Sequence, residues 1–389
     1  MRIDRYANGE FIQVHPTAIP GEDKLRLISE SSRGEGGRIW VYGDSTKTIQ
    51  DPQGKEIPCG KTGQPWYFLE EMYPVFGNLV PRDIAAREVL RVCERGLGID
   101  GKDQVYLDVS HLPSQVQNKI ASVLEIYQKF TGEDPRKVPM KIFPAVHYSM
   151  GGAWVDWPAA DDPDRETRFR QMTNISGCFQ VGESEFQYHG ANRLGANSLL
   201  SCIYGGLVAG SEVPRYIDQL TTSYGTLPGK IFSSSLASEE AAKHEILTRD
   251  GAENIHKLHD ELSDLMVMNV TVKRNNVDLQ KTLEGICSIR ERMQKVGLDD
   301  RGTVMNQTYQ FASQFSPMIE IALAITKGAL LRNEFRGAHY KPEFPQRDDA
   351  NWLKTTIATY DPNGVEPIIT YQPIDTRHLK PIAREDRKS

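Results

Sequence analysis

Residues 189–199 read HGANRLGANSL, a run in which small residues surround a histidine, an arginine and two asparagines. Glycine and alanine let the backbone approach a flat ligand closely. The N–H groups at a helix N-terminus attract electron-rich oxygen, and a helix is expected over 197–209. The guanidinium of Arg193 can hold a carboxylate through two hydrogen bonds. The run therefore predicts a cofactor-binding turn, against the alternative of a glycine-rich turn with a structural arginine ion pair.

Polar residues gather at three further places in the first half of the chain: 15–17 with 29–37, 81–83, and 147–152 with 182–183. Taken singly, each place has an ordinary structural explanation. His15 could be a core histidine near a strand end, and Ser29 with Glu30 could cap a helix. Arg82 could simply belong to a helix start. Because no single cluster establishes a function, the clusters carry weight only together.

The hydrophobic pattern predicts a mixed chain that becomes helical in its second half. Helices are expected over 83–94, 114–130, 197–209 and 314–331, and strands over 104–109, 141–146, 175–181 and 368–371. Apolar residues recur at helical spacing from 238 to about 296 with charged residues between them, which predicts a helical bundle. The segment 156–170 is rich in Asp, Pro and Arg and is expected to be a surface loop.

Residues 96–101 read GLGIDG and match the dinucleotide-binding pattern GxGxxG. That pattern binds pyrophosphate only where it follows a strand and opens a helix. Here it follows a predicted helix and precedes a predicted strand. We therefore interpret it as a helix cap and a turn, and the rest of the chain offers no dinucleotide fingerprint.

Composition excludes several classes of function. The chain has 389 residues, a net charge of −6 and no basic stripe, which disfavours a nucleic-acid partner. Its five cysteines include no CxxC pair, so neither a disulfide framework nor a metal site is expected. No apolar run approaches the roughly 18 residues that span a bilayer, so any membrane contact is expected to come through partner subunits.

Several motifs occur in the order seen in the flavoprotein subunits of succinate dehydrogenase and fumarate reductase and in L-aspartate oxidase. The chain resembles this family in FIQVHPTAIPG (11–21), LISESSRGEGG (27–37), LVPRDIAAREV (79–89), HYSMGG (147–152) and HGANRLGANSLL (189–200). Near the end, RNEFRGAH (332–339) and RDDANWL (347–353) resemble the C-terminal signature of the succinate dehydrogenase branch. The resemblance extends over essentially the whole chain.

The resemblance implies an α/β plus α+β fold class, with an incomplete Rossmann-like FAD-binding domain, a capping domain and a C-terminal helical bundle. The implied segments are 1–14 (remnant of the FAD-binding domain), 15–146 (capping domain), 147–234 (C-terminal part of the FAD-binding domain), 235–345 (helical domain) and 346–389 (small C-terminal region). In the family, GxGxxG and, in many members, a histidine covalently linked to FAD lie well upstream of the HPT motif. HPT begins here at His15, so we expect the chain to lack the N-terminal FAD-binding portion.

The resemblance implies a C4 dicarboxylate substrate, succinate or fumarate, held at both of its carboxylates. His147 and Arg193 are implied to bind one carboxylate. His15 and Ser29 are implied to bind the other. Charge-assisted hydrogen bonds of this kind anchor the dianion and polarise the double bond of fumarate.

The resemblance also implies the catalytic and cofactor residues. Arg82 corresponds to the residue that transfers the proton, and Glu30 and Arg33 correspond to the relay that restores it. Arginine is an unusual acid because guanidinium is normally always protonated, and an adjacent relay eases that difficulty. The implied FAD contacts are Glu183, at the ribose portion, and Ser198 and Leu199, near the isoalloxazine.

The leading hypothesis is the flavoprotein subunit of a succinate:quinone oxidoreductase. The family then implies an iron–sulfur subunit and membrane anchor subunits as partners, with this chain at the cytoplasmic face of the membrane. A soluble fumarate reductase or an L-aspartate oxidase is the alternative with the same site. An alternative of another class is an inactive fragment that cannot hold FAD alone.

Overall fold

The computed structural model describes residues 4–19, 26–28 and 30–382, so the predicted substrate residue Ser29 lies outside the described residues. The chain divides into two compact units, which are described separately: Met1–Ile12 with Ser149–Ile374, and Gln13–Tyr148 with Asp375–Ser389. The first is called the cofactor unit below, and the second the capping unit. The five segments implied by the resemblance remain a prediction.

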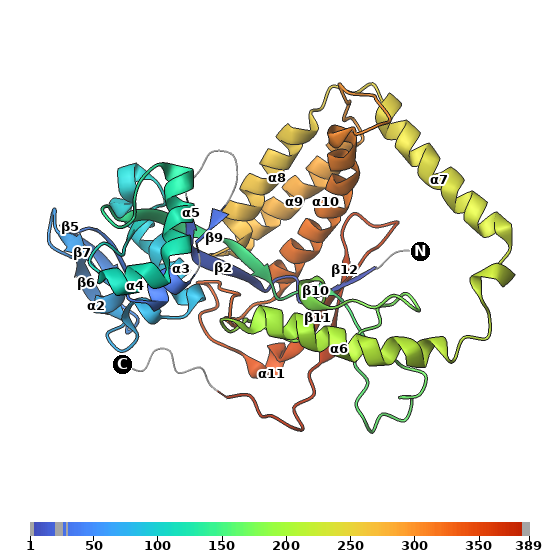
Figure 1. Cartoon of the computed structure of the whole chain (residues 1–389), viewed down its shortest axis with the longest axis horizontal. Helices are drawn as coiled ribbons and strands as arrows, with labels where there is room; N and C mark the ends of the chain where they lie inside the picture. The colour runs from blue at the N-terminus through green and yellow to red at the C-terminus, as the bar shows by residue number, and fades with distance from the viewer. Residues whose placement is uncertain (1–3, 20–25, 29, 383–389) are drawn as a thin grey trace. The chain divides into compact units, whose positions relative to one another are not determined.

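The sheet of the capping unit has six strands in the order β3-β2-β9-β8-β4-β7. Their bounds are β2 Ile12–Ile19, β3 Arg26–Leu27, β4 Arg38–Tyr42, β7 Pro65–Trp66, β8 Val105–Asp108 and β9 Met140–Ser149. The hairpin of β5 (Asp44–Gln50) and β6 (Glu56–Cys59) adds a small second sheet. The helices are α1 Ser31–Gly34, α2 Phe68–Met72, α3 Arg82–Val92, α4 Ser114–Lys119 and α5 Ala121–Thr131 (Figure 1).

The capping unit is held together by strands and helices that each bury one apolar face. In β4, Ile39 and Val41 point to the same face of the strand and are fully buried. In α3, Ile84 and Val89 lie in the same buried cluster. Pro81 stands directly before α3, where a fixed φ and a missing N–H cost nothing. The sheet and α3 thereby form one core.

The segment 96–101 is a helix cap and a turn, as expected. Gly96 and Gly101 both adopt left-handed φ values, of 71° and 72°. The segment follows α3 and the short π-helical turn Cys93–Leu97, and it precedes β8. It therefore does not open a helix and lacks the setting in which GxGxxG binds phosphate.

The cofactor unit contains a four-stranded antiparallel sheet in the order β10-β1-β11-β12. Its strands come from three distant parts of the chain: β1 Arg5–Ala7, β10 Gly152–Ala153, β11 Lys354–Thr359 and β12 Ile368–Pro373. Tyr6 pairs with Ala153 on one side and with Ala358 on the other. The first described strand therefore joins the middle of the chain to its end.

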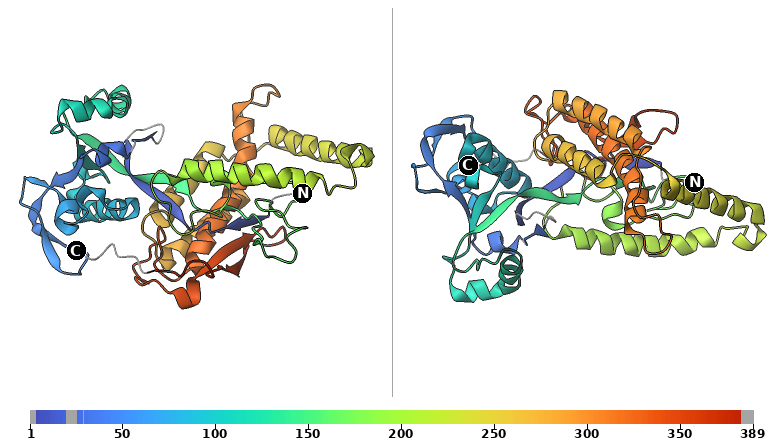
Figure 2. Two further views of the ribbon diagram at one scale, coloured as in Figure 1. Left: turned by 60° about the horizontal axis from the view of Figure 1, so that its bottom comes forward. Right: turned by 90° about the horizontal axis from the view of Figure 1, so that it is seen from above.

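Three helices form a bundle in the cofactor unit: α8 Ile255–Val270 and α9 Asn276–Met293, within the segment predicted to be a bundle, and α10 Gln307–Leu331, which contains the further helix expected over 314–331. They lie side by side in Figures 1 and 2 and share one buried cluster, which includes Leu258, Ile286 and Phe315. Each helix is capped by the side chain of an asparagine that accepts backbone N–H groups. The preceding helix α7 (Gly229–Thr248) is mostly exposed and extends away from the bundle.

Several expected elements differ in the structure. The strand expected over 175–181 is wrong: these residues form a turn around Gly177, whose φ of 81° breaks an extended backbone. The helix expected over 114–130 is two helices, α4 and α5, separated at Ile120. The helix expected over 197–209 continues as α6 to Ile217.

A buried arginine holds the cofactor unit's remote segments together. Arg332, at the end of α10, is fully buried and donates to Glu10 Oε1 (2.7 Å) and Glu334 Oε1 (2.8 Å). It also donates to the carbonyls of Trp352 and Lys354, both at 2.9 Å. Since one side chain satisfies groups before β2, after α10 and in β11, its loss would leave several buried groups unpaired.

Lys341 is the clearest source of pH-dependent stability in this unit. Its buried ammonium donates to Asn276 Oδ1 (2.7 Å), the Leu330 carbonyl (2.8 Å) and Asn333 Oδ1 (3.1 Å), none of which is charged. Burial, with the nearby charge of Arg274, lowers its pKa from 10.5 to about 7. The folded state therefore binds this proton more weakly than the unfolded chain does.

We predict that Lys341 makes the unit more stable as pH rises from about 7 towards 10.5, because only the unfolded chain holds the proton across that range. The difference in melting temperature between Lys341→Met and the parent should change in the parent's favour from pH 7 to pH 9. Groups that titrate equally in both proteins shift both melting temperatures by the same amount, so they do not affect the difference. A difference that does not vary with pH would contradict the prediction.

Candidate active site

The carboxylate of Glu30 is shared by three other predicted site residues of the capping unit. His15 Nε2 lies 3.0 Å from Glu30 Oε2, and Arg82 Nε donates to the same oxygen at 2.8 Å. Arg33 Nε donates to the other oxygen, Oε1, at 2.6 Å, and the Arg33 Nη2 group pairs with it as well. The structure thus brings together His15, Glu30, Arg33 and Arg82.

These four side chains come from three separate elements. His15 lies on the buried strand β2, whereas Glu30 immediately precedes the short helix α1 that contains Arg33. Arg82 is the first residue of α3, just after Pro81. A residue at a helix start keeps its position because the helix behind it is packed in the core. His15, Arg33 and Arg82 thus come from regular elements, whereas Glu30 stands just before α1.

Charge keeps Glu30 ionised. Burial alone would raise the pKa of Glu30, but the hydrogen bond from His15 and the charges of Arg33 and Arg82 outweigh it and hold the pKa far below its usual value. Burial lowers the pKa of His15, and the hydrogen bond and charge of Glu30 offset that effect only in part. At neutral pH the site therefore contains a carboxylate, two guanidinium groups and a neutral imidazole.

His147 and Gln13 complete the described part of this cluster. The His147 ring, on β9, meets the His15 ring edge to face, with centroids 5.1 Å apart. Gln13 Oε1 accepts a hydrogen bond of 3.3 Å from Arg82 Nη1. The sequence analysis did not single out Gln13. The two-residue period of a strand could have identified Gln13, because it stands two residues before His15 and faces the same side.

The remaining predicted residues belong to the cofactor unit. Arg193 is buried, and Glu183 Oε1 accepts the backbone N–H of Ser149 at 2.9 Å. Ser198 and Leu199 lie in the first turn of α6 (Asn197–Ile217), where Leu199 is 74% exposed. The predicted cofactor residues therefore share one unit, separate in the chain's organisation from the Glu30 cluster.

The predicted cofactor turn fits a flat ligand such as the expected FAD. A Cβ at Gly190 or Gly195 would find no described atom within 4 Å, so the backbone there is open. Ala196, before α6, adopts a left-handed φ of 65°, and no described side chain caps the helix. The Asn197 N–H donates to the Leu194 carbonyl at 3.3 Å, and the next N–H groups at the start of α6 can face electron-rich oxygen, beside the apolar side chain of Leu199.

A second segment supports this turn from far along the sequence. The N–H of Ala338 donates to the Ala191 carbonyl at 2.9 Å. The neighbouring Gly337 has φ of 56°, and a Cβ there would lie 2.3 Å from the same oxygen. Only glycine fits this contact, so the RGAH motif packs directly against the HGANRLG motif.

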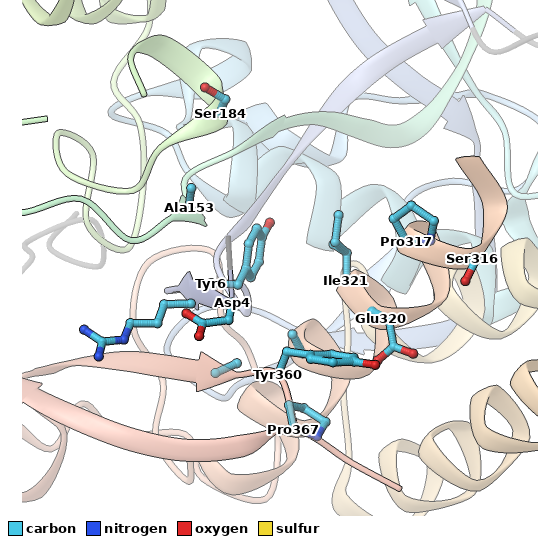
Figure 3. Close-up of a pocket in the computed structure, with 13 residues that line it drawn as sticks. Asp4, Tyr6, Ala153, Ser184, Ser316, Pro317, Glu320, Ile321, Tyr360 and Pro367 are labelled. Atoms are coloured by element: carbon cyan, nitrogen blue, oxygen red, sulfur yellow. The ribbon is translucent and has the colours of Figure 1, made fainter. Parts of the chain in front are cut away.

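A cavity of about 570 Å³ lies elsewhere in the cofactor unit (Figure 3). Tyr6, Ile321 and Tyr360 surround it, from β1, α10 and the segment after β11. None of the predicted site residues lines it. The cavity is therefore not the predicted cofactor turn or the Glu30 cluster.

Two family profiles match the chain. The profile described as an FAD binding domain matches residues 4–199, about half of the chain. The profile described as the fumarate reductase flavoprotein C-terminus matches residues 259–386. Together the two profiles overlap the motifs in the first half of the chain and the motifs near its end.

Individual relatives agree with these profiles. A succinate dehydrogenase flavoprotein subunit of Bacillus subtilis is 49% identical, covering 98% of this chain and 61% of that protein. A fumarate reductase flavoprotein subunit of Haemophilus influenzae is 30% identical, and the match covers 96% of this chain and 59% of that protein. The solved quinol fumarate reductase of Escherichia coli matches with a TM-score of 0.80 at 28% identity, covering 99% of this chain and 62% of that one. The expected fold class is confirmed, and the chain spans about three-fifths of these relatives' length.

We predict that Glu30→Gln lowers the free energy of unfolding of the capping unit by about 2–4 kcal/mol, because it leaves the buried Arg33 without its carboxylate. Urea denaturation followed by tryptophan fluorescence measures the change. The matched control is Glu125→Gln on the exposed face of α5, which should change stability by less than about 0.5 kcal/mol. Equal effects of the two substitutions would show that Glu30 does not anchor the cluster.

Proposed function

Since the chain belongs to the FAD-binding flavoprotein family that contains the succinate dehydrogenase and fumarate reductase flavoprotein subunits, we propose that it serves the oxidation of succinate to fumarate. The family is one of FAD-dependent oxidoreductases, and FAD is its cofactor. The observation that carries the proposal is the Glu30 cluster, in which His15 and Arg82 share one carboxylate. The 49% identical relative favours the dehydrogenase over the reductase.

The proposed reaction needs a group that binds a dianion and a group that takes a proton. FAD, when bound, supplies the acceptor for the hydride that leaves one carbon of succinate. His15, Ser29 and His147 are proposed to bind the substrate carboxylates, with Arg193 assigned from the resemblance alone. Arg82 is proposed to give a guanidinium proton to Glu30 and to take up the proton of the adjacent carbon in its place. A positioned proton acceptor of this kind contributes typically 10²–10⁴-fold to a rate.

The Glu30 carboxylate supports a proton relay through its geometry. Arg82 and Arg33 each hydrogen-bond to a different oxygen of the same carboxylate, at 2.8 and 2.6 Å between donor nitrogen and acceptor oxygen. A proton can therefore pass from Arg82 to Glu30 without a side-chain rotation, and Arg33, already protonated, can pass it on only by releasing a proton of its own. Because the pKa of Glu30 is so low, the carboxylate can hold that proton only transiently. The relay is thus proposed to run past Arg33 and to end in solvent.

The site is also compatible with two other reactions, fumarate reduction and L-aspartate oxidation, and assays with different substrates distinguish them. We propose succinate oxidation over fumarate reduction by a soluble enzyme and over L-aspartate oxidation. Purified protein supplied with FAD should reduce an artificial electron acceptor with succinate. It should release no hydrogen peroxide with L-aspartate. Turnover with L-aspartate alone, or flavin binding without turnover of any C4 dicarboxylate, would overturn the assignment.

The proposed partners follow from the proposed reaction. We propose an iron–sulfur subunit as the electron acceptor and membrane anchor subunits that hold the complex at the cytoplasmic face of a membrane. One solved neighbour is described as an Sdh1 complex of Mycobacterium smegmatis, at 25% identity and a TM-score of 0.69. Among the described residues, none of the helices has the length and hydropathy needed to cross a bilayer. Affinity purification from the native cell tests the proposal, because the chain should bring an iron–sulfur protein with it.

We predict that Arg82→Gln, in the flavin-loaded protein, lowers turnover at least about 10²-fold, because it removes the proposed proton acceptor. Dicarboxylate binding should change only a few-fold, as measured by perturbation of the flavin absorbance. Arg91→Lys is the control, since Arg91 lies on the same helix and pairs with Glu88 rather than Glu30. Normal turnover of Arg82→Gln would refute the role of Arg82.

A further inference from the structure

Arg274 is a fully buried arginine at the junction between α8 and α9, and no carboxylate is hydrogen-bonded to it in the described part of the chain. Its Nε group donates to the Val270 carbonyl, at the end of α8, at 2.7 Å. Its Nη1 group lies 2.5 Å from His339 Nδ1. A buried guanidinium is costly unless it is well hydrogen-bonded, so an arginine that faces only neutral acceptors indicates a positional task.

The surroundings of Arg274 and His339 fix the protonation of both. Burial lowers the pKa of Arg274 to about 10, which leaves it charged at neutral pH. Burial also lowers the pKa of His339 well below its usual value, so the imidazole is neutral. A guanidinium can only donate, so Nδ1 must be the bare nitrogen. The ring hydrogen is then on Nε2, which donates to the Arg332 carbonyl, at the end of α10, at 2.8 Å.

The turn that ends at His339 is tied to Arg274 at two points. The backbone N–H of Arg274 donates to the Tyr340 carbonyl at 3.1 Å, next to the side-chain contact with His339. Within residues 336–339, Arg336 and His339 exchange two backbone hydrogen bonds of 3.0 Å. The position of this tight turn is therefore set by the junction between α8 and α9.

The same turn contacts the predicted cofactor turn, residues 189–199. The Ala338 N–H donates to the Ala191 carbonyl at 2.9 Å, and Ala338 is buried. The cofactor turn contains two left-handed residues, Gly190 and Ala196, and for alanine that conformation is unfavourable. Such a backbone persists only when its surroundings hold it. A short series of contacts thus leads from the helical bundle to the cofactor turn.

We propose that Arg274 is a positioning residue for the flavin: through His339 it holds residues 336–339 against Ala191, and it thereby keeps the predicted cofactor turn in its binding conformation. Arg274 acts through the backbone of the two turns. The proposal rests on the proposed function for the identity of the ligand, whereas the contacts that carry it can be tested without flavin.

The substitutions Arg274→Lys and Arg274→Met separate the hydrogen-bond donor from the shape of the side chain, because the two new side chains have the same length. Hydrogen exchange of the full chain, followed by mass spectrometry, measures how often each turn opens. In Arg274→Met, residues 189–199 and 336–339 should exchange about tenfold faster, the change expected when one buried hydrogen bond is lost. Arg274→Lys can still donate to His339 and should exchange at close to the parent's rate.

Ile286→Val is the matched control, because Ile286 lies in the buried cluster of the bundle and outside the contacts that join Arg274 to Ala191. It should raise exchange throughout the cofactor unit rather than in the two turns alone. A uniform rise in Arg274→Met, or exchange as slow as in the parent, would overturn the proposal.

The tautomer of His339 in the parent keeps the proposal testable if Arg274→Met does not fold. Long-range ¹H–¹⁵N correlations of the chain labelled with ¹⁵N-histidine should show a bare Nδ1 and a protonated Nε2. The signals of His339 are identified by their shift in Arg274→Lys. A hydrogen on Nδ1 would by itself overturn the proposal, because Arg274 could then not donate to that nitrogen.

Flavin binding separates this proposal from the proposed function. FAD titrated into the protein should bind Arg274→Met about tenfold more weakly than the parent or Arg274→Lys, as measured by quenching of flavin fluorescence. Equal affinities of the parent and Arg274→Met would overturn the proposal. A parent that bound FAD but oxidised no succinate would sink the proposed function alone, and the loss of affinity in Arg274→Met would still support the role of Arg274.

Discussion

The carboxylate of Glu30 is the interaction on which the capping unit's site depends. Without this shared anion the two guanidinium groups would repel each other, and the neutral imidazole of His15 would lose its hydrogen-bond acceptor. Arg33 is buried, and a buried cation is tolerated only when it is paired and hydrogen-bonded. A buried ion pair adds little net stability compared with apolar packing. Its value here is geometric, because it fixes the position of Arg82 relative to His15.

The cofactor unit uses a buried ion cluster in the same way. Arg332 joins Glu10, Glu334 and the backbone of β11, so segments from both ends of the described chain meet at one guanidinium. Arginine suits this task because its planar group carries five donors in fixed directions. Each unit thus contains one charged centre that collects distant segments. Neither centre could be replaced by a single apolar residue without leaving polar groups unpaired.

The hydrophobic pattern of the sequence predicted the helices and strands better than it predicted the contacts between them. The apolar periods of α3 and α10 were readable because each repeats over several turns. The segment 175–181 was misread because its apolar residues surround Gly177, and the left-handed backbone of that residue cannot be seen in a period. The single helix expected over 114–130 failed at Ile120 for a related reason, since nothing in the apolar spacing marks a break.

The site was recognisable only through motifs. The ion pair of Glu30 with Arg82 joins residues on different elements, and no spacing rule predicts such a contact. Gln13 was passed over because a polar side chain on a fully buried strand breaks the usual alternation of a strand. At Gly337 the backbone of one motif contacts the carbonyl of Ala191 in another, so neither motif can change its backbone conformation during evolution without affecting the other. Related sequences should therefore vary at the two motifs together. Where Gly337 is replaced, the turn around Ala191 should differ as well.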